Sequence, residues 1–443
     1  MGAGSSSPIS ENLLRRSVLP ALVLLTGGLA YESAPHPALV LGVIVAGAAV
    51  LVAAFRPEIT LGLFLASIPL EYGWELHGNQ SLTVTKVAGG LCFLSFALFA
   101  ARTGRRLRFD RSHLLVVLLL CIALASTTQA GSSGEALTAT LRYLSWALLY
   151  FVLTQFVGET ATLRLLVWSL VASAGAAGVW GCVNFLSGRT PLATLPYGQQ
   201  NDYAFVLASV LFLAFWLTRR EVGARRWIAA TAAACILAGI ALSLSRGAYL
   251  ALAVAVAFFC VMHRRQAKVL AVLAVLAALV VVGFIAVNPG RVQEGFQQKQ
   301  AVAQENVNSR LTLWRGAVDL AGSHPLLGIG PGNFGDYYFD ITHNPVGTPP
   351  LLVAHETYLE VAAELGPLGL VVFLAFLGLI LVRLNEAVRS GAGPPELAIF
   401  LRVSFLAICV GFLTVSEEFF APVWLVAGLS TLVWLERPSA SST

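Results

Sequence analysis

The sequence is poor in charged residues and lacks the patterns that mark several large enzyme classes. Only 12% of its 443 residues are charged, whereas a soluble domain carries about 25%. It contains no P-loop, no HExxH zinc motif, no DxD motif and no Ser-centred GxSxG turn. These absences argue against a P-loop nucleotide hydrolase, a zinc protease, a transferase that holds a nucleotide sugar through a metal, and a serine hydrolase.

Paired cysteines and a large basic region are also missing. None of the six cysteines forms a CxxC pair, and all lie inside apolar runs: Cys92, Cys121, Cys182, Cys235, Cys260 and Cys409. We interpret them as packing residues without a disulfide or metal role. The formal net charge is +5, but the positive residues sit in a few short joints, so the charge does not indicate nucleic-acid binding. We predict no metal and no cofactor.

Long apolar runs are the dominant feature of the chain, in which 57% of residues are hydrophobic. The runs are continuous and about 17–22 residues long, the length that crosses the hydrocarbon core of a bilayer as a helix. We predict spans near 17–31, 37–55, 58–71, 82–101, 113–129, 137–157, 163–186, 202–218, 226–243, 247–262, 268–287, 365–383, 396–415 and 419–435. Because two of these are short, the predicted fold is an all-α membrane protein with a bundle of about 12–14 transmembrane helices.

The basic residues predict which side of the membrane each joint faces. Short cytoplasmic loops are enriched in Lys and Arg, and the basic joints of this chain are 102–111, 219–226, 264–268 and 383–389. They alternate with poorly charged joints, so both termini are predicted to be cytoplasmic. The chain then divides into N-terminal transmembrane helices (1–287), an extracytoplasmic loop containing short helices (288–364), and C-terminal transmembrane helices with a cytoplasmic tail (365–443).

The predicted outer loop, 288–364, is the only long polar stretch, and loops longer than about 15 residues are usually functional or disordered. Residues 309–322 are predicted to form a short amphipathic helix with Asn308 as its cap. Its predicted apolar face consists of Leu311, Trp314, Val318 and Ala321. We expect this helix to lie along the membrane interface.

Arginines near the outer rim are the first candidates for chemistry, because a charge placed at the membrane usually has a partner or a function. Arg246 lies in the hinge between two apolar runs, with no acidic residue nearby in the sequence, so its guanidinium is free to bind an anion. Arg189 lies in another outer joint, just before the next predicted helix. The alternatives are a snorkelling side chain for Arg246 and an ordinary solvated loop residue for Arg189.

Two further arginines, Arg310 and Arg315, flank Trp314 on the predicted amphipathic helix and are candidates for substrate binding. Arg315 and Asp319 are spaced as an ion pair along one helix face, so a structural role competes with a functional one for Arg315.

His355 is the candidate general base. It opens the apolar helix that follows the outer loop, and a helix N-terminus disfavours the imidazolium form. A histidine held neutral near pH 7 is suited to accept a proton. The alternative is a helix-cap or interface histidine, and His324, which precedes Pro325, is interpreted as structural.

Three segments together resemble a known family. They are Ser245-Arg246-Gly247, the stretch from Ser309 through Trp314 to His324 and Phe334, and His355 to Glu360 followed by Glu364 to Gly369. Their order and spacing are similar to those of the O-antigen ligase and O-antigen polymerase superfamily of bacterial membrane glycosyltransferases. The resemblance is best over residues 245–370.

The resemblance implies a donor glycan carried on undecaprenyl diphosphate and presented at the outer face of the bacterial inner membrane. It implies an inverting, metal-independent transfer to an acceptor hydroxyl, which is lipid A core in ligases and a second lipid-linked glycan in polymerases. The active site would face the periplasm, and the partners would be these substrates and membrane lipids, with no nucleic acid.

The resemblance also implies roles for single residues. Arg246 matches the diphosphate-binding arginine, Arg189 resembles a second one, and His355 matches the proposed general base. Glu356 stands where the family commonly has Asn or Ser, and we expect its negative charge to raise the pKa of His355.

Trp314 and the Tyr337-Tyr338 pair are candidate surfaces for stacking sugars, with core packing as the alternative. We predict a ligase first, with a polymerase close behind. A family member that glycosylates a protein is the third predicted function. The alternative from a different class is a non-catalytic flippase for lipid-linked oligosaccharides.

Overall fold

The computed structural model describes residues 56–73, 83–156, 159–196, 198–264, 303–343, 353–394, 396–416 and 421–436, with a few isolated residues between 282 and 297. Every regular element among them is helical, which confirms the predicted all-α class. The predicted spans 17–31 and 37–55, most of 268–287 and both chain ends lie outside the described residues. The domain limits predicted at 287 and 364 stay a prediction.

Seven of the described helices are long and apolar enough to cross a membrane. They are α5 (Val84–Thr103), α6 with its 3-10 extension η3 (Arg111–Gln129), α7 (Ser133–Thr154), α8 (Thr160–Leu186), α9 (Gln200–Arg220), α10 (Gly223–Ser243) and α17 (Gly366–Ser390). Three shorter apolar helices are α11 (Arg246–Met262), α18 (Leu397–Gly411) and α19 (Ala421–Leu435). The protein is therefore a multi-pass membrane protein.

The described residues form two compact units, and the smaller one comprises 56–68 and 83–108. In it α4 (Pro57–Ser67) packs against α5, with the rings of Phe64 and Phe93 edge to face at 5.7 Å. The Thr83 hydroxyl caps the start of α5, and Gly104 ends it in a left-handed conformation. The short 3-10 helix η2 (Ile68–Gly73) follows α4.

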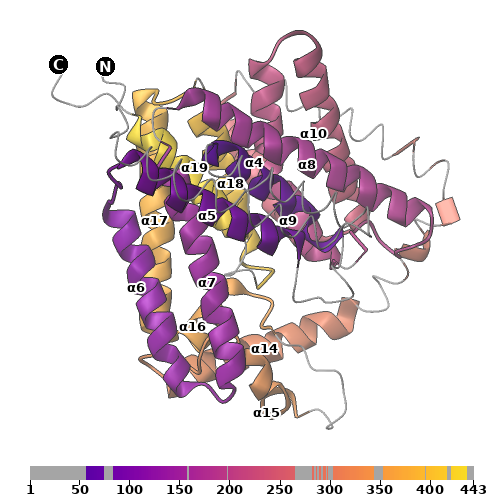
Figure 1. Cartoon of the computed structure of the whole chain (residues 1–443). Helices are drawn as coiled ribbons and strands as arrows, with labels where there is room; N and C mark the ends of the chain where they lie inside the picture. The colour runs from indigo at the N-terminus through magenta and orange to yellow at the C-terminus, as the bar shows by residue number, and fades with distance from the viewer. Residues whose placement is uncertain are drawn as a thin grey trace, which may run out of the picture. The chain divides into compact units, whose positions relative to one another are not determined.

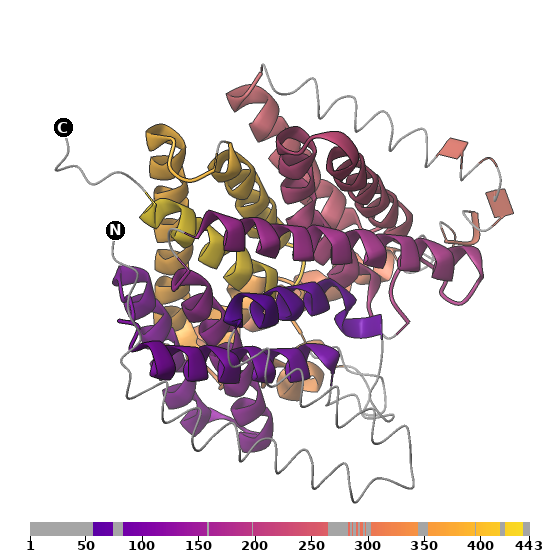
Figure 2. The same ribbon diagram turned by 45° about the horizontal axis from the view of Figure 1, so that its top comes forward.

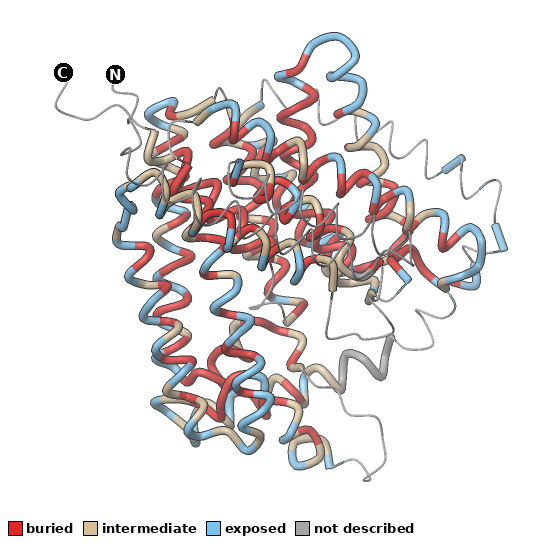
Figure 3. Tube along the Cα trace, viewed as in Figure 1, coloured by how far each residue is buried: buried red, intermediate tan, exposed pale blue. Residues whose placement is uncertain are grey.

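The larger unit is built around α9. In its most apolar 18-residue window 89% of the residues are buried, against 39–56% in the other candidate spans of this unit. It packs against α8, α10 and α18, and Figure 3 shows the outer helices carrying more exposed positions, as lipid-facing helices do. The Tyr203 hydroxyl of α9 donates to the carbonyl of Ala177 on α8 at 3.1 Å, where small residues let the helices approach closely.

A second group within this unit consists of α6, α7, α17 and α19, which pack side by side (Figures 1 and 2). Beyond one end of it lie the helices of the predicted outer loop: α14 (Ala303–Ser323), η4 (Phe334–Tyr337), α15 (Tyr338–Thr342) and α16 (Thr357–Glu364). These surround a small core that includes Leu313, Ala317, Phe334 and Tyr338.

The predicted start of the amphipathic helix is wrong. α14 begins at Ala303, so Asn308 lies inside the helix and is not its cap. The buried apolar positions are Leu313 and Ala317, while Leu311 and Val318 are 43% and 55% exposed. Leu313 and Ala317 pack against α15 and α16, whereas Trp314 and Ala321 of the predicted stripe are partly buried. The expected position of the helix along the membrane interface stays a prediction.

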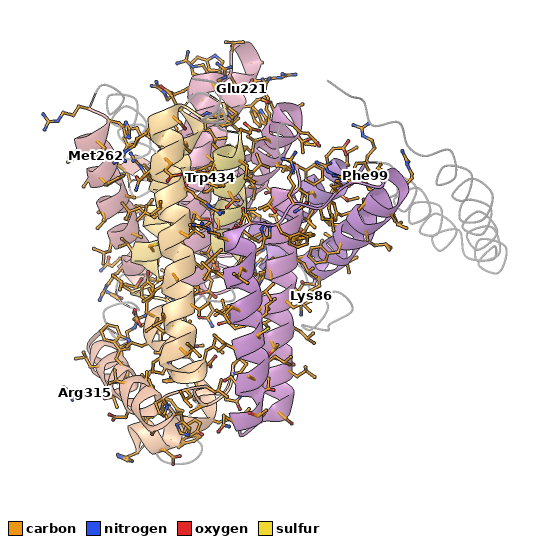
Figure 4. All side chains as sticks on the ribbon, turned by 90° about the vertical axis from the view of Figure 1, so that its left-hand side faces the viewer. Lys86, Phe99, Glu221, Met262, Arg315 and Trp434 are labelled. Carbon is orange, nitrogen blue, oxygen red and sulfur yellow. The ribbon has the colours of Figure 1, made fainter. Side chains whose placement is uncertain are left out.

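Two of the basic joints, 219–226 and 383–389, lie toward the end of the larger unit opposite α14. Figure 4 shows Glu221, Met262 and Trp434 toward this end and Arg315 at the other. Arg219 forms a two-pronged ion pair with Glu396 at 2.9 Å, and Arg164 pairs with Glu221. We name this the paired end.

Arg383 corrects one predicted helix boundary. The predicted span stopped at Arg383, but α17 continues to Ser390 and holds this side chain at 3% exposure. Its guanidinium lies 3.2 Å from the Asp110 carboxylate, donates to the Ser112 hydroxyl at 2.8 Å and stacks over the ring of Trp434 at 4.3 Å. A buried arginine with these partners fixes α17 to α6 and α19.

Candidate functional site

The three sequence segments converge on one turn, residues 412–416, which follows α18 and is named here the 412–416 turn. The Thr357 backbone N–H at the start of α16 donates to the Phe412 carbonyl at 2.9 Å, and the Thr357 hydroxyl donates to the Val415 carbonyl at 2.7 Å. Arg310 of α14 donates through Nη1 to the Thr414 carbonyl at 3.2 Å. Two helices of the outer loop are therefore held by main-chain acceptors of the same turn.

The third segment, Ser245-Arg246-Gly247, meets this turn at Gly247. A Cβ added at Gly247 would lie 2.9 Å from the Cβ of Thr414, so the start of α11 lies directly against the turn. Arg246 is the first residue of α11 and is exposed, and in the described part of the chain it has no hydrogen bond or ion pair. Its guanidinium is therefore available to an external anion.

The joint that contains Arg189 lies beside the same hinge. The Ala193 N–H donates to the Leu242 carbonyl near the end of α10 at 3.1 Å, and the Ser245 hydroxyl donates to Asn201 at 2.9 Å. Arg189 itself is exposed, and no described residue pairs with its side chain. The structure thus brings this joint to the hinge that carries Arg246.

His355 is partly buried, and its environment lowers its pKa from 6.5 to about 4. Burial is the larger cause, because it disfavours the charged imidazolium, and the positive charge of Arg310 adds to it. The prediction that His355 is neutral near pH 7 agrees with this environment. The pKa of His355 is lowered by burial and by a neighbouring cation, whereas the sequence pattern attributed its neutral form to the helix N-terminus.

The backbone around His355 is strongly constrained. Its φ is +58°, in the left-handed region that non-glycine residues adopt rarely. On one side the Ala354 N–H donates to the Glu360 carboxylate at 2.7 Å, and Ser416 of the 412–416 turn binds the same carboxylate. On the other side Glu356 caps α16 by accepting from the Leu359 N–H at 2.5 Å.

This role for Glu356 overturns one expectation. The sequence predicted that its charge would raise the pKa of His355, yet the pKa of His355 is lowered. Burial raises the pKa of Glu356 itself, and its carboxylate is turned toward the helix start. Glu356 acts as the N-cap of α16.

The glycine-rich segment from Gly328 to Phe334 has a structural role and binds α16 through main-chain hydrogen bonds. Backbone N–H groups of Gly332 and Phe334 donate to the buried Glu364 carboxylate at 2.6 and 3.2 Å, and burial raises the pKa of Glu364 to about 7. Gly330 has a φ of +94°, and a Cβ there would lie 2.6 Å from that of Ala130. Its glycines allow close packing between α16 and the tips of α6 and α7.

The remaining predicted site residues lie apart from His355. Arg315 is exposed on a different face of α14 from Arg310 and lines a separate cavity. Tyr338 is 5% exposed and belongs to the small core, so its ring offers no open face, whereas Tyr337 lines the same cavity as Arg315. Trp314 is half-buried next to the inner face of α14, and its ring N–H has no partner among the described residues.

Sequence reasoning missed the contribution of the 412–416 turn. Its contacts are made by backbone carbonyls, by the Thr414 side chain and by the Ser416 hydroxyl, and no residue pattern in the sequence marked it. His324 behaves as predicted, because its ring nitrogen contacts the Leu320 carbonyl at the end of α14. Within the described ranges no group of three or more His, Cys, Asp or Glu side chains is arranged to hold a metal.

Residues 230–374 match the family model described as O-antigen ligase. The matched region contains Arg246, Arg310 and His355, and it ends before the 412–416 turn. It confirms the resemblance to the O-antigen ligase and polymerase superfamily that these segments indicated. No curated protein matches the chain.

Proposed function

We propose that this membrane protein of the O-antigen ligase and polymerase type transfers a glycan from undecaprenyl diphosphate to an acceptor hydroxyl at the outer face of the bacterial inner membrane. The observation that carries the proposal is the meeting of the Arg246 hinge, Arg310 and the His355 segment at the 412–416 turn. A free cation and a neutral imidazole are thereby placed around one structural element.

The reaction proposed is a single displacement. The acceptor hydroxyl oxygen forms a bond to the anomeric carbon, the bond from that carbon to the phosphate oxygen breaks, and the diphosphate leaves with the electron pair. The hydroxyl proton passes to His355, and attack from the face opposite the leaving group inverts the configuration. General-base assistance of this kind is typically worth about 10²–10⁴ in rate.

The arginines supply the charge that the leaving group needs. Negative charge grows on the diphosphate as the sugar bond breaks, so donors aimed at it act most strongly in the transition state. Arg246 and Arg189 are exposed and have no carboxylate partner among the described residues. A planar guanidinium binds phosphate oxygens in two-pronged fashion, which lets these residues act without a divalent ion.

Ligation to lipid A core is the first choice, and polymerisation of lipid-linked repeat units is the alternative. To separate them, purified protein is reconstituted in liposomes with an undecaprenyl-diphosphate-linked glycan and EDTA, and half of the samples receive lipid A core. Products are followed by gel and mass spectrometry. Glycan joined to lipid A core supports the ligase, and longer lipid-linked chains without that acceptor support the polymerase.

The catalytic role of His355 is tested in the same assay. His355→Ala is expected to lower the transfer rate by about 10²–10⁴, while His324→Ala, a histidine change at the end of α14, is expected to retain activity. Normal folding is checked by thermal unfolding. Unchanged glycan transfer by His355→Ala would remove the proposed base, and no new bond in any sample would favour the flippase.

A further inference from the structure

A polar cavity lies between α14 and the η4–α15 segment, at the end of the larger unit opposite the paired end. Its volume is about 520 Å³, within the ~300–1,000 Å³ of ordinary ligand pockets. Its polar lining includes Thr312, Arg315, Asp319, Tyr337, Asp340 and His343. Figure 4 shows Arg315 at this end of the larger unit.

This cavity is separate from the His355 site. Arg310, which acts on His355, and Asp319, which lines the cavity, are about two and a half turns apart on α14 at roughly 3.6 residues per turn. They therefore project from opposite faces of the helix. A ligand in the cavity lies across α14 from the reacting groups.

The charges of the lining indicate what it does not bind. Two carboxylates, Asp319 and Asp340, face the cavity with one guanidinium, that of Arg315. All three side chains are exposed, and no ion pair joins them to one another or to other described residues. The predicted Arg315–Asp319 ion pair is thus not formed, and the excess of negative charge disfavours a phosphate or uronate.

The same lining suits a sugar. Unpaired carboxylates accept hydrogen bonds from hydroxyl groups, while the Arg315 guanidinium donates. The ring of Tyr337, with Ile341 and Leu320, adds apolar surface beside these polar groups. A pyranose presents both kinds of surface, with C–H groups on its face and hydroxyls around its edge.

The two helices that line the cavity, α14 and α15, are closely packed. Gly316 on α14 lies so close to Ile341 on α15 that an added Cβ would approach its side-chain atoms within 2.5–2.8 Å. The two elements that carry the lining are therefore in direct contact, which fixes the spacing of the backbones from which the binding groups project.

We propose that this cavity binds uncharged sugar units of the glycan that are remote from the bond being formed. The proposal rests on the proposed function for the identity of the glycan. It divides the substrate between two faces of α14: the charged diphosphate on the side of Arg310 and His355, and uncharged sugars on the side of Asp319 and Tyr337.

The test measures binding of free glycan to the full-length protein in lipid nanodiscs. The probe is the repeat-unit glycan released from its diphosphate carrier by mild acid, and binding is followed by saturation-transfer NMR titration. The lining variants are Tyr337→Ala and the double change Asp319→Asn with Asp340→Asn. The control is Asp336→Asn, which changes an exposed carboxylate of η4 that does not line the cavity.

Each lining variant is expected to bind the free glycan about tenfold more weakly, because hydrogen bonds to charged groups contribute strongly to binding. Asp336→Asn is expected to bind it as the wild type does, and inorganic diphosphate is expected not to displace it. Unchanged binding by both lining variants overturns the proposal, as does displacement by diphosphate.

The two proposals fail separately. Glycan binding that depends on Asp319 and Tyr337 in a protein without transfer activity would keep this cavity and remove the proposed reaction. Transfer that depends on His355, in a protein whose lining variants bind free glycan normally, would keep the reaction and remove the cavity.

Discussion

The arginines at the two ends of the larger unit differ in their partners. At the paired end Arg164, Arg219 and Arg383 each lie against a carboxylate, respectively Glu221, Glu396 and Asp110. At the outer end Arg246 and Arg189 have no carboxylate partner among the described residues, and Arg310 has only the Thr414 carbonyl. These three arginines are thus neutralised by carboxylates of the chain, whereas Arg246 and Arg189 are left available. Other arginines toward the paired end, such as Arg220 and Arg226, are exposed as well.

This difference separates structural from ligand-binding charge more clearly than position in the sequence does. The charge of a paired arginine is balanced by a carboxylate of the chain, so loss of that arginine is expected to lower stability. An unpaired arginine near a neutral histidine has its charge available to a substrate, and its loss is expected to affect the reaction. The following predictions test that division.

The largest effect on stability is expected from Arg383→Leu. Removing one partner of a buried ion pair leaves the other uncompensated and typically costs about 3–5 kcal/mol. Unfolding of the purified variant, followed by tryptophan fluorescence during titration with SDS, measures this loss. Adding Asp110→Asn to the same chain should recover part of the stability, and a single variant as stable as the wild type would show that the pair contributes nothing.

Arg246→Ala is expected to show the opposite behaviour. Loss of one transition-state donor typically lowers the rate by about 10²–10³, while stability should be unchanged because no described residue pairs with Arg246. The liposome assay measures the first and SDS unfolding the second. A clear drop in stability would place Arg246 with the structural arginines.

The third prediction concerns the pH dependence that Arg310 gives to His355. A base must be deprotonated, and the pKa of His355 is about 4, so kcat/KM of the wild type should fall only as the pH approaches about 4. Arg310→Gln removes the cation, so the pKa should rise toward 6.5 and the fall should begin at higher pH. Using the ratio of rates at pH 5 and pH 8 makes the test independent of any overall loss of activity.

Arg315→Gln is the matched control for this profile, because it removes the same charge from another face of α14. Its ratio of rates should equal that of the wild type. An identical profile for the Arg310 and Arg315 variants would mean that the charge of Arg310 does not act on His355.

The smallest effect is expected from Arg219→Ala at the paired end. Both side chains of the Arg219–Glu396 pair are about one third exposed, at 28% and 31%, and exposed pairs contribute about 0.2–1 kcal/mol. Transfer activity should stay at the wild-type level. A loss of transfer comparable to that of Arg246→Ala would show that pairing is a poor guide to function.

Much of the fold was predictable because hydrophobic run length sets the length of a membrane helix. The predicted spans at 163–186 and 226–243 correspond to α8 and α10, and differ at their starts by only a few residues. Arg383 shows the limit of this reasoning. A charge in the last turns of an apolar run reads as the end of the span, and only its tertiary partner Asp110 explains why the helix continues.

Arg246 and His355 could be named as candidates from the sequence because each carries its own chemistry, and their roles in the site stay predictions. The site was not predictable where neighbours decide the outcome. Leu313 and Ala317 of α14 pack in the small core, an inner face that the sequence pattern did not indicate. The Glu356 carboxylate caps α16 and does not raise the pKa of His355 as expected. The grouping around Thr414 depends on main-chain carbonyls, which every residue possesses.

The long-range bonds of the outer loop also fix the order in which the site can assemble during synthesis. The Ser132 N–H at the tip of α7 can form its hydrogen bond only after Asn333 has been synthesised, and the Gly332 N–H only after Glu364 has been synthesised. The hydrogen bonds of Arg310 and Thr357 to the 412–416 turn form later still, because that turn is synthesised after both residues. Because a chain is inserted from its N-terminus onward, His355 acquires its surroundings only after α18 has entered the membrane. The surroundings of His355, on which the proposed reaction depends, are therefore complete only once residue 416 has been made.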